Sequence, residues 1–493
     1  MRNIGSKKLL KNIRLIKDSV KDTFLKIIRP RLSDLDRSKS ISKNFFLHIH
    51  SAKIHKYCLL PNFTLGLGLI AFFLFLILTI TGILLMIYYT PSVKDAYYSI
   101  KDIIFIVSGG RFIRNMHRWA AQAMVVVVLL HMARVFYTSA YKKARRVNWL
   151  AGIGLLMVTL LFSFSGYLLP WDQLAYWATT IAANIAASTN ELTNALKITH
   201  ILDLGRLTKI LLLGSESVGQ ESLNRFYLLH VVLLPLTIII LMGYHFWRIR
   251  KAGGLALPEN ADEKILLMER ISGTDMKSSQ KKSTYKRKLN QYTLSWPILI
   301  WIEISIFILV LTTLMVFSYF FDAPIREFAN PDVPENPAKS PWYFLGLQEL
   351  VSYSAFGGGI IIPLLLVISI LLIPYLDKED RYIGIWFSNI RGRLVFLYSL
   401  VFSNILTIII IAISVHFGWI RSWFPGVPQI IIIFINPGTI ITSFYVVWSL
   451  VILRKTNSTR MAAIAIFTCI FVGFIIFTAI GNWFRGPDWK FFL

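Results

Sequence analysis

Four histidines of this 493-residue sequence lie in two long apolar stretches, at nearly the same spacing in each. His117 and His131 are 14 residues apart, and His230 and His245 are 15 residues apart. On a helix, with about 100° and 1.5 Å per residue, each pair comes within roughly 40–60° of one face and is separated by about 21–22 Å along the axis. Neutral imidazoles are good ligands for iron and related metal ions. Each stretch therefore offers two metal ligands on one side of a helix.

The elements that carry these histidines are predicted to be transmembrane helices. Hydrophobic residues make up 55% of the sequence and charged residues only 16%, which excludes an ordinary soluble protein. Apolar runs of about 18 residues or more indicate helices that cross a membrane. We predict spans at about residues 62–90, 117–138, 149–170, 226–248, 294–320, 351–375, 394–416, 428–453 and 460–483. The expected fold is an all-α integral membrane protein with about nine transmembrane helices.

The second and fourth spans run in the same direction, because one complete crossing separates them. His117 then faces His230, and His131 faces His245. A single histidine in a span more often forms a hydrogen bond between helices or a proton relay. That alternative explains four histidines in matched registers poorly. We therefore expect two haem groups stacked across the bilayer, each with its iron held by two histidines.

Cysteine usage restricts the type of haem. Cys58 and Cys469 are the only cysteines, and the sequence has no Cys-x-x-Cys-His motif for covalent attachment. Nor does it have a cysteine cluster for an iron–sulfur centre. The expected cofactors are two groups of haem b.

Glycines on the neighbouring spans repeat the histidine spacing. Gly68 and Gly82 lie 14 residues apart on the first span, and Gly152 and Gly166 lie 14 residues apart on the third. A flat haem between helices needs a closely approaching backbone, and glycine has no Cβ to obstruct it. We predict that these glycines contact the haems; the alternative is ordinary helix packing.

Three arginines border the histidines on the second span, namely Arg114, Arg118 and Arg134. Guanidinium groups pair well with carboxylates, so we predict contacts with haem propionates. The alternative is ordinary anchoring at the membrane interface.

The net charge of +26 would suggest nucleic-acid binding in a soluble protein. Here the basic residues gather in segments between alternate spans, at residues 1–57, 142–146, 277–288, 381–393 and 454–460. By the positive-inside rule the N-terminus is cytoplasmic, and the C-terminus, after nine crossings, lies on the outer side. We expect the lipid bilayer as the environment, residues 1–57 as a basic arm on the cytoplasmic leaflet, and no nucleic-acid partner.

Three motifs give the sequence a family resemblance. They are Arg114-Asn-Met-His117-Arg-Trp, Gly166-Tyr-Leu-Leu-Pro-Trp-Asp-Gln173, and Ser217-Val-Gly-Gln followed by Asn224-Arg-Phe-Tyr-Leu-Leu-His230. Together they resemble cytochrome b of the quinol-oxidising cytochrome bc complexes. The 15-residue separation on the fourth span is similar to the chloroplast-type and related bacterial proteins.

The resemblance implies a division of the chain. Residues 58–255 resemble the family's four-helix di-haem bundle strongly, and residues 256–292 form a basic cytoplasmic linker. Residues 293–420 resemble, more weakly, the three-helix half called subunit IV in split forms. Residues 421–493, with two further helices and an outer-side tail, have no clear counterpart.

The resemblance also implies a function. Members form the core of a quinol:cytochrome-type oxidoreductase with a Rieske iron–sulfur protein and a c-type cytochrome, and we expect a homodimeric complex in a bacterial inner membrane. Quinol is oxidised on the outer side and quinone is reduced on the cytoplasmic side. One alternative is a di-haem membrane anchor of another quinone-linked dehydrogenase or reductase. Another is a transporter whose intramembrane histidines relay protons.

The quinol oxidation site is expected where two segments meet on the outer side. Tyr167, Pro170 and Trp171 lie at the outer end of the third span. The loop between the fifth and sixth spans contains Trp342 and Tyr343, in a Ser-Pro-Trp-Tyr-Phe element that resembles the family's Pro-Glu-Trp-Tyr element. The resemblance implies that these residues line the quinol site.

This element departs from the family at Pro341, which occupies the position of the usual proton-accepting glutamate. A buried carboxylate is well suited to take a proton from quinol. Glu349 lies about two helical turns further on, and we predict that it projects to the same side and replaces the missing group. The alternative is a charge near a helix start that interacts with the helix dipole.

Two further expectations concern the cytoplasmic side. Arg250, and with it Lys251, is the candidate contact for the quinone reduced there; ordinary interfacial anchoring is the alternative. The cysteine that attaches an extra haem in the chloroplast-type protein aligns with Gly66, and Cys58 lies too far upstream to replace it. We therefore predict no third, covalently attached haem.

Overall fold

The computed structural model describes residues 33–43, 51–271 and 291–492, and within them helices dominate. The strands there are β1 (Lys53–His55) and β2 (Tyr292–Leu294), which pair antiparallel. This confirms the predicted all-α class. Most of the basic N-terminal segment and part of the basic linker, including residues 277–288, lie outside the described residues.

The described part of the chain contains nine helical runs that are long and apolar enough to cross a membrane, as predicted. They are α4 (Leu67–Met86), α6 (Gly110–Tyr137), η2 (Lys143–Arg145) with α7 (Arg146–Leu168), α11 (Gln220–Leu228) with η3 (Leu229–Leu233) and α12 (Leu234–Lys251), η4 (Ser295–Leu299) with α15 (Ile300–Phe320), η5 (Gly357–Ile361) with α17 (Ile362–Leu376), α18 (Ile390–Phe417) with α19 (Ile420–Trp423), α21 (Pro437–Thr456), and α22 (Thr459–Ala479) with η6 (Ile480–Phe484).

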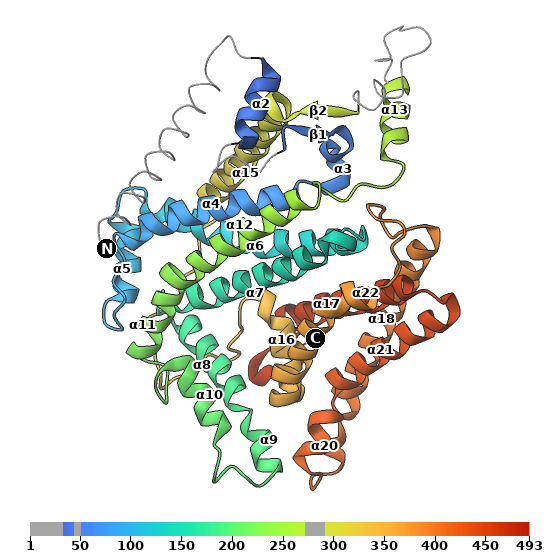
Figure 1. Cartoon of the computed structure of the whole chain (residues 1–493). Coiled ribbons are helices and arrows are strands. Elements are labelled where there is room, and N and C mark those ends of the chain that lie inside the picture. Colours follow the sequence, from blue (N-terminus) through green and yellow to red (C-terminus); the bar gives the residue numbers. More distant parts are fainter. Residues whose placement is uncertain (1–32, 44–50, 272–290, 493) are drawn as a thin grey trace, which may run out of the picture.

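Shorter helices lie before, between and after these runs (Figure 1). They are α2 (Asp34–Lys43), η1 (Lys56–Leu59), α3 (Pro61–Thr64), α5 (Ala96–Phe105), α8 (Gln173–Ala187), α9 (Asn190–Ala195), α10 (Leu204–Leu213), α13 (Ala261–Ile271), α16 (Trp342–Tyr353), α20 (Gln429–Phe434) and η7 (Pro487–Trp489).

Two boundaries differ from the sequence prediction for identifiable reasons. The second span begins at Gly110 rather than near 117, because its polar first turns are helical too. The eighth is divided at Asn436, whose side chain accepts a hydrogen bond from the Thr439 amide and so starts a new helix at Pro437. Residues before this break form the separate helix α20.

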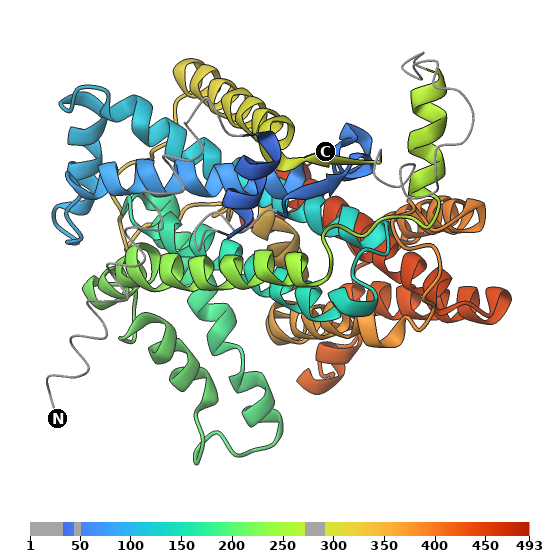
Figure 2. The same cartoon turned by 45° about the horizontal axis from the view of Figure 1, so that its top comes forward.

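Four helices, α4, α6, α7 and α12, lie side by side and form what we call the histidine bundle (Figure 1). α4 packs on α6, α6 on α7, and α7 on α12, around buried apolar side chains such as Leu74, Ala120 and Ile238. α15 packs against the outside of α4 and α6. In Figure 2, α15 is the yellow helix that lies over the blue α4. We call the end at which α6 begins the His117 end, and the opposite end the His131 end.

The C-terminal helices form a second group beside the bundle. α18, α21 and α22 pack on one another, α17 packs on α7, and α16 packs on α22 (Figure 1). An apolar core that includes Phe136, Trp149, Ile464 and Phe467 joins the two groups. The last two spans are therefore integrated with the remaining C-terminal helices through α18.

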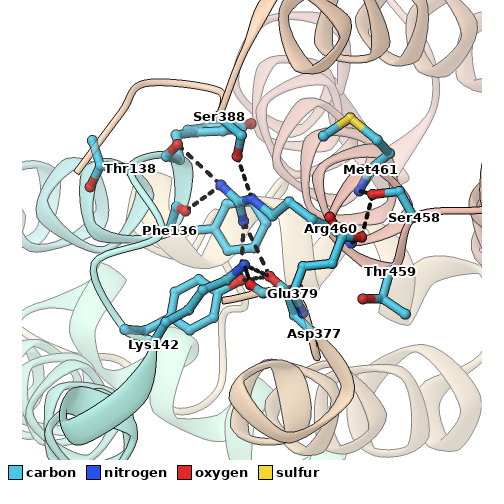
Figure 3. Close-up of polar contacts among 12 residues, drawn as sticks. Phe136, Thr138, Lys142, Asp377, Glu379, Ser388, Ser458, Thr459, Arg460 and Met461 are labelled. Carbon is cyan, nitrogen blue, oxygen red and sulfur yellow. Dashed lines mark hydrogen bonds and ion pairs between the residues drawn. The ribbon is translucent and has the colours of Figure 1, made fainter. Parts of the chain in front are cut away.

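A cluster of buried charges also joins the groups, at the His131 end (Figure 3). Asp377, at the end of α17, lies 2.9 Å from the Lys142 ammonium and 3.8 Å from the Arg460 guanidinium. Arg460, in the first turn of α22, donates to the Phe136 carbonyl at 2.9 Å and the Tyr137 carbonyl at 3.1 Å. These carbonyls belong to the last turn of α6, where a cation is favoured by the helix dipole.

The cluster is closed by further hydrogen bonds. Arg460 donates to the Ser388 hydroxyl at 3.0 Å, and the Glu379 carboxylate accepts from the Ser458 hydroxyl at 2.5 Å. Burial lowers the pKa of Lys142, while Asp377 opposes that shift. The helix that carries His117 and His131 is thus tied at its end to the last span.

Candidate functional site

The structure brings together the histidines that the sequence pairs. The ring centres of His117 and His230 are 6.3 Å apart, with their planes at 70°. His131 and His245 are close enough to interact electrostatically. Two imidazoles that share one metal ion have ring centres roughly 6 Å apart, given metal–nitrogen bonds of about 2 Å. The first pair therefore has the spacing that a single bridging metal ion requires.

The extra residue between His230 and His245 is absorbed by a local change of helix type. His230 lies in η3, a π-helical segment, whereas α6 shows no such interruption between its two histidines. Pro235 follows directly in the first turn of α12, and proline has no N–H for the usual bond to the preceding turn. A π segment accommodates one more residue than an α turn. Both helices can thus face their histidines toward each other although the separations differ.

Hydroxyl groups fix the orientation of two of these rings. The Thr81 hydroxyl donates to the Ile77 carbonyl at 2.7 Å and lies 2.9 Å from Nδ1 of His117. The Ser165 hydroxyl lies 3.1 Å from Nδ1 of His230 and donates to the carbonyl of its own helix turn. Because each hydroxyl hydrogen is used, Nδ1 is the donor and Nε2 keeps a free lone pair for a metal ion.

Thr81 and Ser165 were not among the residues predicted from the sequence. A signal was present, because each directly precedes a glycine of the repeated pattern, Gly82 and Gly166. A hydroxyl beside a close helix contact is well placed to bond a ring on the neighbouring helix.

Each of the four glycines lies against one of the histidine rings. A Cβ at Gly68 would be 3.0 Å from Cε1 of His131, and a Cβ at Gly82 would be 3.2 Å from Cε1 of His117. On α7 the corresponding distances are 3.7 Å from Gly152 to His245 and 2.5 Å from Gly166 to His230. In the structure the glycines make room for the imidazoles, and their contact with the haems themselves stays a prediction.

Replacing Gly166 with alanine is expected to lower the amount of haem b bound between His117 and His230, because the methyl group would meet the His230 ring. Alanine otherwise favours a helix over glycine by about 1 kcal/mol, so helix propensity cannot cause the loss. The measurement is the b-band amplitude of a reduced-minus-oxidised spectrum per unit of protein.

Gly154→Ala is the matched control on the same helix, since its Cβ would meet only the Leu241 side chain at 3.6 Å. Equal amplitudes for both variants would contradict the assigned role of Gly166.

The three arginines predicted beside the haems already have protein partners. Arg114 donates to the Ala323 and Pro324 carbonyls at 2.7 and 2.8 Å. Arg134 donates to the Phe63 carbonyl at 3.0 Å. The guanidinium of Arg118 lies 5.1 Å from the centre of the Tyr167 ring. A guanidinium has five N–H donors, so these bonds leave donors for a propionate.

At the His131 end, Arg250 is half-buried in the last turn of α12. The neighbouring Lys251 ammonium lies 4.8 Å from the centre of the Trp247 ring. This is ordinary cation–π packing for an interfacial lysine.

The long loop between α15 and α16, residues 321–341, leads to the aromatic element Trp342-Tyr343-Phe344. This element packs on the His117 end of the histidine bundle. The Trp342 indole donates to the Gln122 amide oxygen on α6 at 2.6 Å. Tyr343 is buried and lies near Ser163 and Tyr167, both on α7. The predicted residues Tyr167, Trp342 and Tyr343 are therefore brought together. Gln122 and Ser163 were not identified from the sequence.

The other predicted residues of this region lie at the turn between α7 and α8. Pro170 is half-buried, and Trp171 is buried with a positive φ of 52°. The long loop crosses this turn: the Asp172 carboxylate accepts from the Arg326 amide at 3.0 Å, and the Trp171 carbonyl accepts from the Ala329 amide at 3.3 Å. The turn thus positions the loop that leads to Trp342.

Glu349 is fully buried and paired. Its carboxylate accepts from Arg485 Nε at 2.9 Å, from the Trp489 indole at 3.0 Å and from the Tyr353 hydroxyl at 2.7 Å. Because α16 begins at Trp342, Glu349 lies well beyond the first turn, so the alternative of a helix-start charge is wrong. These partners could not be identified in advance, because Arg485 and Trp489 lie far along the chain in the C-terminal tail.

Comparison with known proteins agrees with this geometry. The family model described as Cytochrome b/b6/petB matches residues 55–253, which include all four histidines. Cytochrome b6 of Heliomicrobium gestii is 41% identical over 197 residues, covering 39% of this chain and 87% of that protein. Cytochrome b6 of Prochlorococcus marinus is 41% identical over 187 residues, covering 38% of this chain and 80% of that protein.

A solved structure titled "Hyperthermophilic respiratory Complex III" has a similar fold over more of the chain. Its TM-score is 0.55 at 24% identity, covering 85% of this chain and 91% of that chain. The likeness therefore extends beyond the histidine bundle into the C-terminal helices. With facing histidines on the helices that the family model covers, this membrane-spanning chain belongs to the cytochrome b/b6 family, which implies that it binds haem b.

Proposed function

We propose that the chain is the cytochrome b subunit of a bc-type oxidoreductase, which passes electrons from quinol to a c-type cytochrome. The observation that carries the proposal is the 6.3 Å spacing of His117 and His230, with His131 and His245 paired further along the same helices. When bound, the two haem b groups supply one-electron redox centres at two depths of the membrane. The four histidines would be their axial ligands, and Gly68, Gly82, Gly152 and Gly166 would keep the rings in place.

The quinol oxidation site is proposed at the His117 end, on the outer side of a bacterial inner membrane. There Tyr167, Trp342 and Tyr343 meet, with Pro170 and Trp171 at the adjacent turn. Burial raises the pKa of Tyr343, which keeps its hydroxyl protonated. Arg114 and Arg118 lie near the beginning of α6, at the same end of the bundle. We propose that they bind the propionates of the nearer haem.

Glu349 remains the proposed proton acceptor in place of the glutamate that Pro341 replaces. It is the carboxylate of the same helix, α16, whose first turn carries Trp342 and Tyr343. A carboxylate held in position near the site can take the proton released when quinol is oxidised.

Quinone reduction is proposed at the His131 end, on the cytoplasmic side with the N-terminus. Arg250 is the candidate contact there, and Arg134 the candidate partner of the nearer propionates. A Rieske iron–sulfur protein, a c-type cytochrome and a second copy of the chain are the proposed partners.

We further propose that function divides along the chain. Residues 58–255 would bind the haems, and residues 293–420 would complete the quinol site. Residues 421–493 would add the last two spans and the tail, and residues 1–57 and 256–292 would lie on the cytoplasmic side. The integration of α21 and α22 with α18 supports a role for the last segment within the same unit.

Purification of the intact complex tests the function directly. We expect two haem b groups per chain, an iron–sulfur cluster in a co-purifying subunit, and quinol-dependent reduction of a c-type cytochrome. Haem b without quinol oxidation would favour the membrane-anchor alternative, and absence of haem would overturn the proposal.

Trp342→Phe is expected to lower quinol oxidation at least tenfold while the haem spectrum stays unchanged. Phenylalanine fills most of the space but cannot donate to Gln122, so the aromatic element loses its bond to α6. Small misplacements of this kind reduce rates strongly. The measurement is steady-state quinol oxidation together with the b-band amplitude. Trp301→Phe is the control, because Trp301 is 63% exposed on α15. Equal activity of the two variants would exclude Trp342 from the site.

A further inference from the structure

The carboxylate of Glu349 is bound by residues close to the C-terminus, more than a hundred positions further along the chain. Arg485 contributes two bonds, Nε to Oε2 at 2.9 Å and Nη2 to Oε1 at 2.5 Å, in the parallel arrangement typical of a strong arginine–carboxylate pair. Trp489 adds a third bond at 3.0 Å. The side chain of Arg485 is 9% exposed and that of Glu349 is 0% exposed. This is a buried ion pair, and removing one partner leaves an uncompensated charge.

Residues 485–491, which we call the C-terminal hook, are folded around this pair. Arg485 donates to the Trp489 carbonyl at 2.7 Å, and its guanidinium lies 4.0 Å from the centre of the Phe491 ring. Arg485 and Phe491 also form an isolated β-bridge. The hook therefore folds around the Arg485 guanidinium, which is the group that binds Glu349.

The hook is also fastened to the long loop that precedes α16. The Asn336 amide donates to the Asp488 carboxylate at 2.7 Å, and the Asp488 amide donates back to the Asn336 side chain at 2.6 Å. Lys339 donates to the Asn482 carbonyl at 2.9 Å, just before the hook. Loop, hook and last span are thus connected immediately upstream of Trp342.

Close backbone contacts seat α16 on the last span. A Cβ at Gly346 would be 3.0 Å from the Thr478 hydroxyl, and a Cβ at Gly481 would be 3.1 Å from Cβ of Leu345. Neither position leaves room for a larger side chain without movement of its neighbour. At the start of the same helix, Trp342 and Tyr343 contact the histidine bundle through Gln122 and Ser163. The last span and its hook therefore determine where α16 presents these two residues.

We propose that Arg485 and Trp489 of the C-terminal hook are positioning residues of the quinol oxidation site, which hold α16 through Glu349. This inference rests on the proposed function. It gives the last span and the C-terminal hook a role: they complete the site from outside the histidine bundle. It also means that the charge of Glu349 is balanced by Arg485, a residue that lies far from it in the sequence.

Arg485→Gln is the test, in the purified complex. We expect quinol oxidation to fall at least tenfold, while dithionite reduces the haems to the same b-band amplitude as in the parent protein. A general folding defect would lower both readouts, so their separation identifies a positioning role. Arg485→Lys, which keeps the charge but not the two-bond fork, is expected to recover part of the activity.

Trp489→Phe provides a second variant if Arg485→Gln does not assemble, because it removes only the indole donor; it too is expected to lower quinol oxidation with haem unchanged. Lys490→Gln is the matched control, since the side chain of this hook residue is 79% exposed and forms an ion pair with exposed Asp488. Activity within twofold of the parent in Arg485→Gln and Trp489→Phe, with Trp342→Phe still impaired, would overturn this inference alone. A parent complex without quinol oxidation would instead overturn the proposed function.

Discussion

Replacing His117 with leucine is expected to reduce the haem b content of the purified chain from two groups to one and to abolish quinol oxidation. Leucine fills the space of the ring but has no nitrogen to bind iron, and the facing His230 alone is a poor substitute for a two-ligand site. The adjacent Thr81 hydroxyl would also lose the ring that it orients. Haem extraction and a redox titration of the b band measure the result.

His416→Leu is the matched control for that experiment. His416 lies in the last turn of α18 and is exposed, so its loss is expected to leave both haems and the activity unchanged. His131→Leu should remove the other haem and leave the first. Two haems with unchanged spectra in His117→Leu would contradict the assignment of the ligands.

Replacing Asp377 with alanine is expected to destabilise the chain strongly, by about 3–5 kcal/mol, because it leaves two buried cations without their carboxylate. Lys142 and Arg460 have side chains 1% exposed, and Asp377 is completely buried between them (Figure 3). Without that charge the tie between the end of α6 and the start of α22 is expected to open. Thermal unfolding of the complex in detergent, followed by loss of haem absorbance, measures the effect.

Glu216→Ala serves as the comparison, because Glu216 pairs with Arg206 on the surface with both side chains about 60% exposed. Pairs of this kind contribute little. We expect no measurable change in the midpoint of unfolding. Equal midpoints for the Asp377 and Glu216 variants would show that the buried cluster does not stabilise the joint.

The four histidines illustrate what a local sequence pattern can and cannot predict. A helix has a fixed period, so the 14-residue separation in α6 specified one face directly. The 15-residue separation before His245 does not fit that period as well. The π segment around His230, next to Pro235, resolves the mismatch, and its position depends on how α12 packs against α7. The spans themselves were predictable because a bilayer requires long apolar helices.

Glu349 shows the opposite case. Its place on a helix two turns after Trp342 followed from the sequence, but its partners did not. Arg485 and Trp489 are more than a hundred positions away, in a tail that carries no local signal for what it binds. Contacts of this kind arise only when the last span has packed on α16.

The sequence by itself determined the membrane class, the nine spans that the described residues contain, the pairing of His117 with His230, and the family resemblance that the comparisons confirm. These properties depend on residue periodicity and hydrophobicity, which act locally along the chain. Only the tertiary structure decided that glycines clear imidazole rings, that a buried charge cluster ties α6 to α22, and that the C-terminal hook binds Glu349. Each of these requires two distant segments to meet, and side-chain packing rather than helix period selects which ones do.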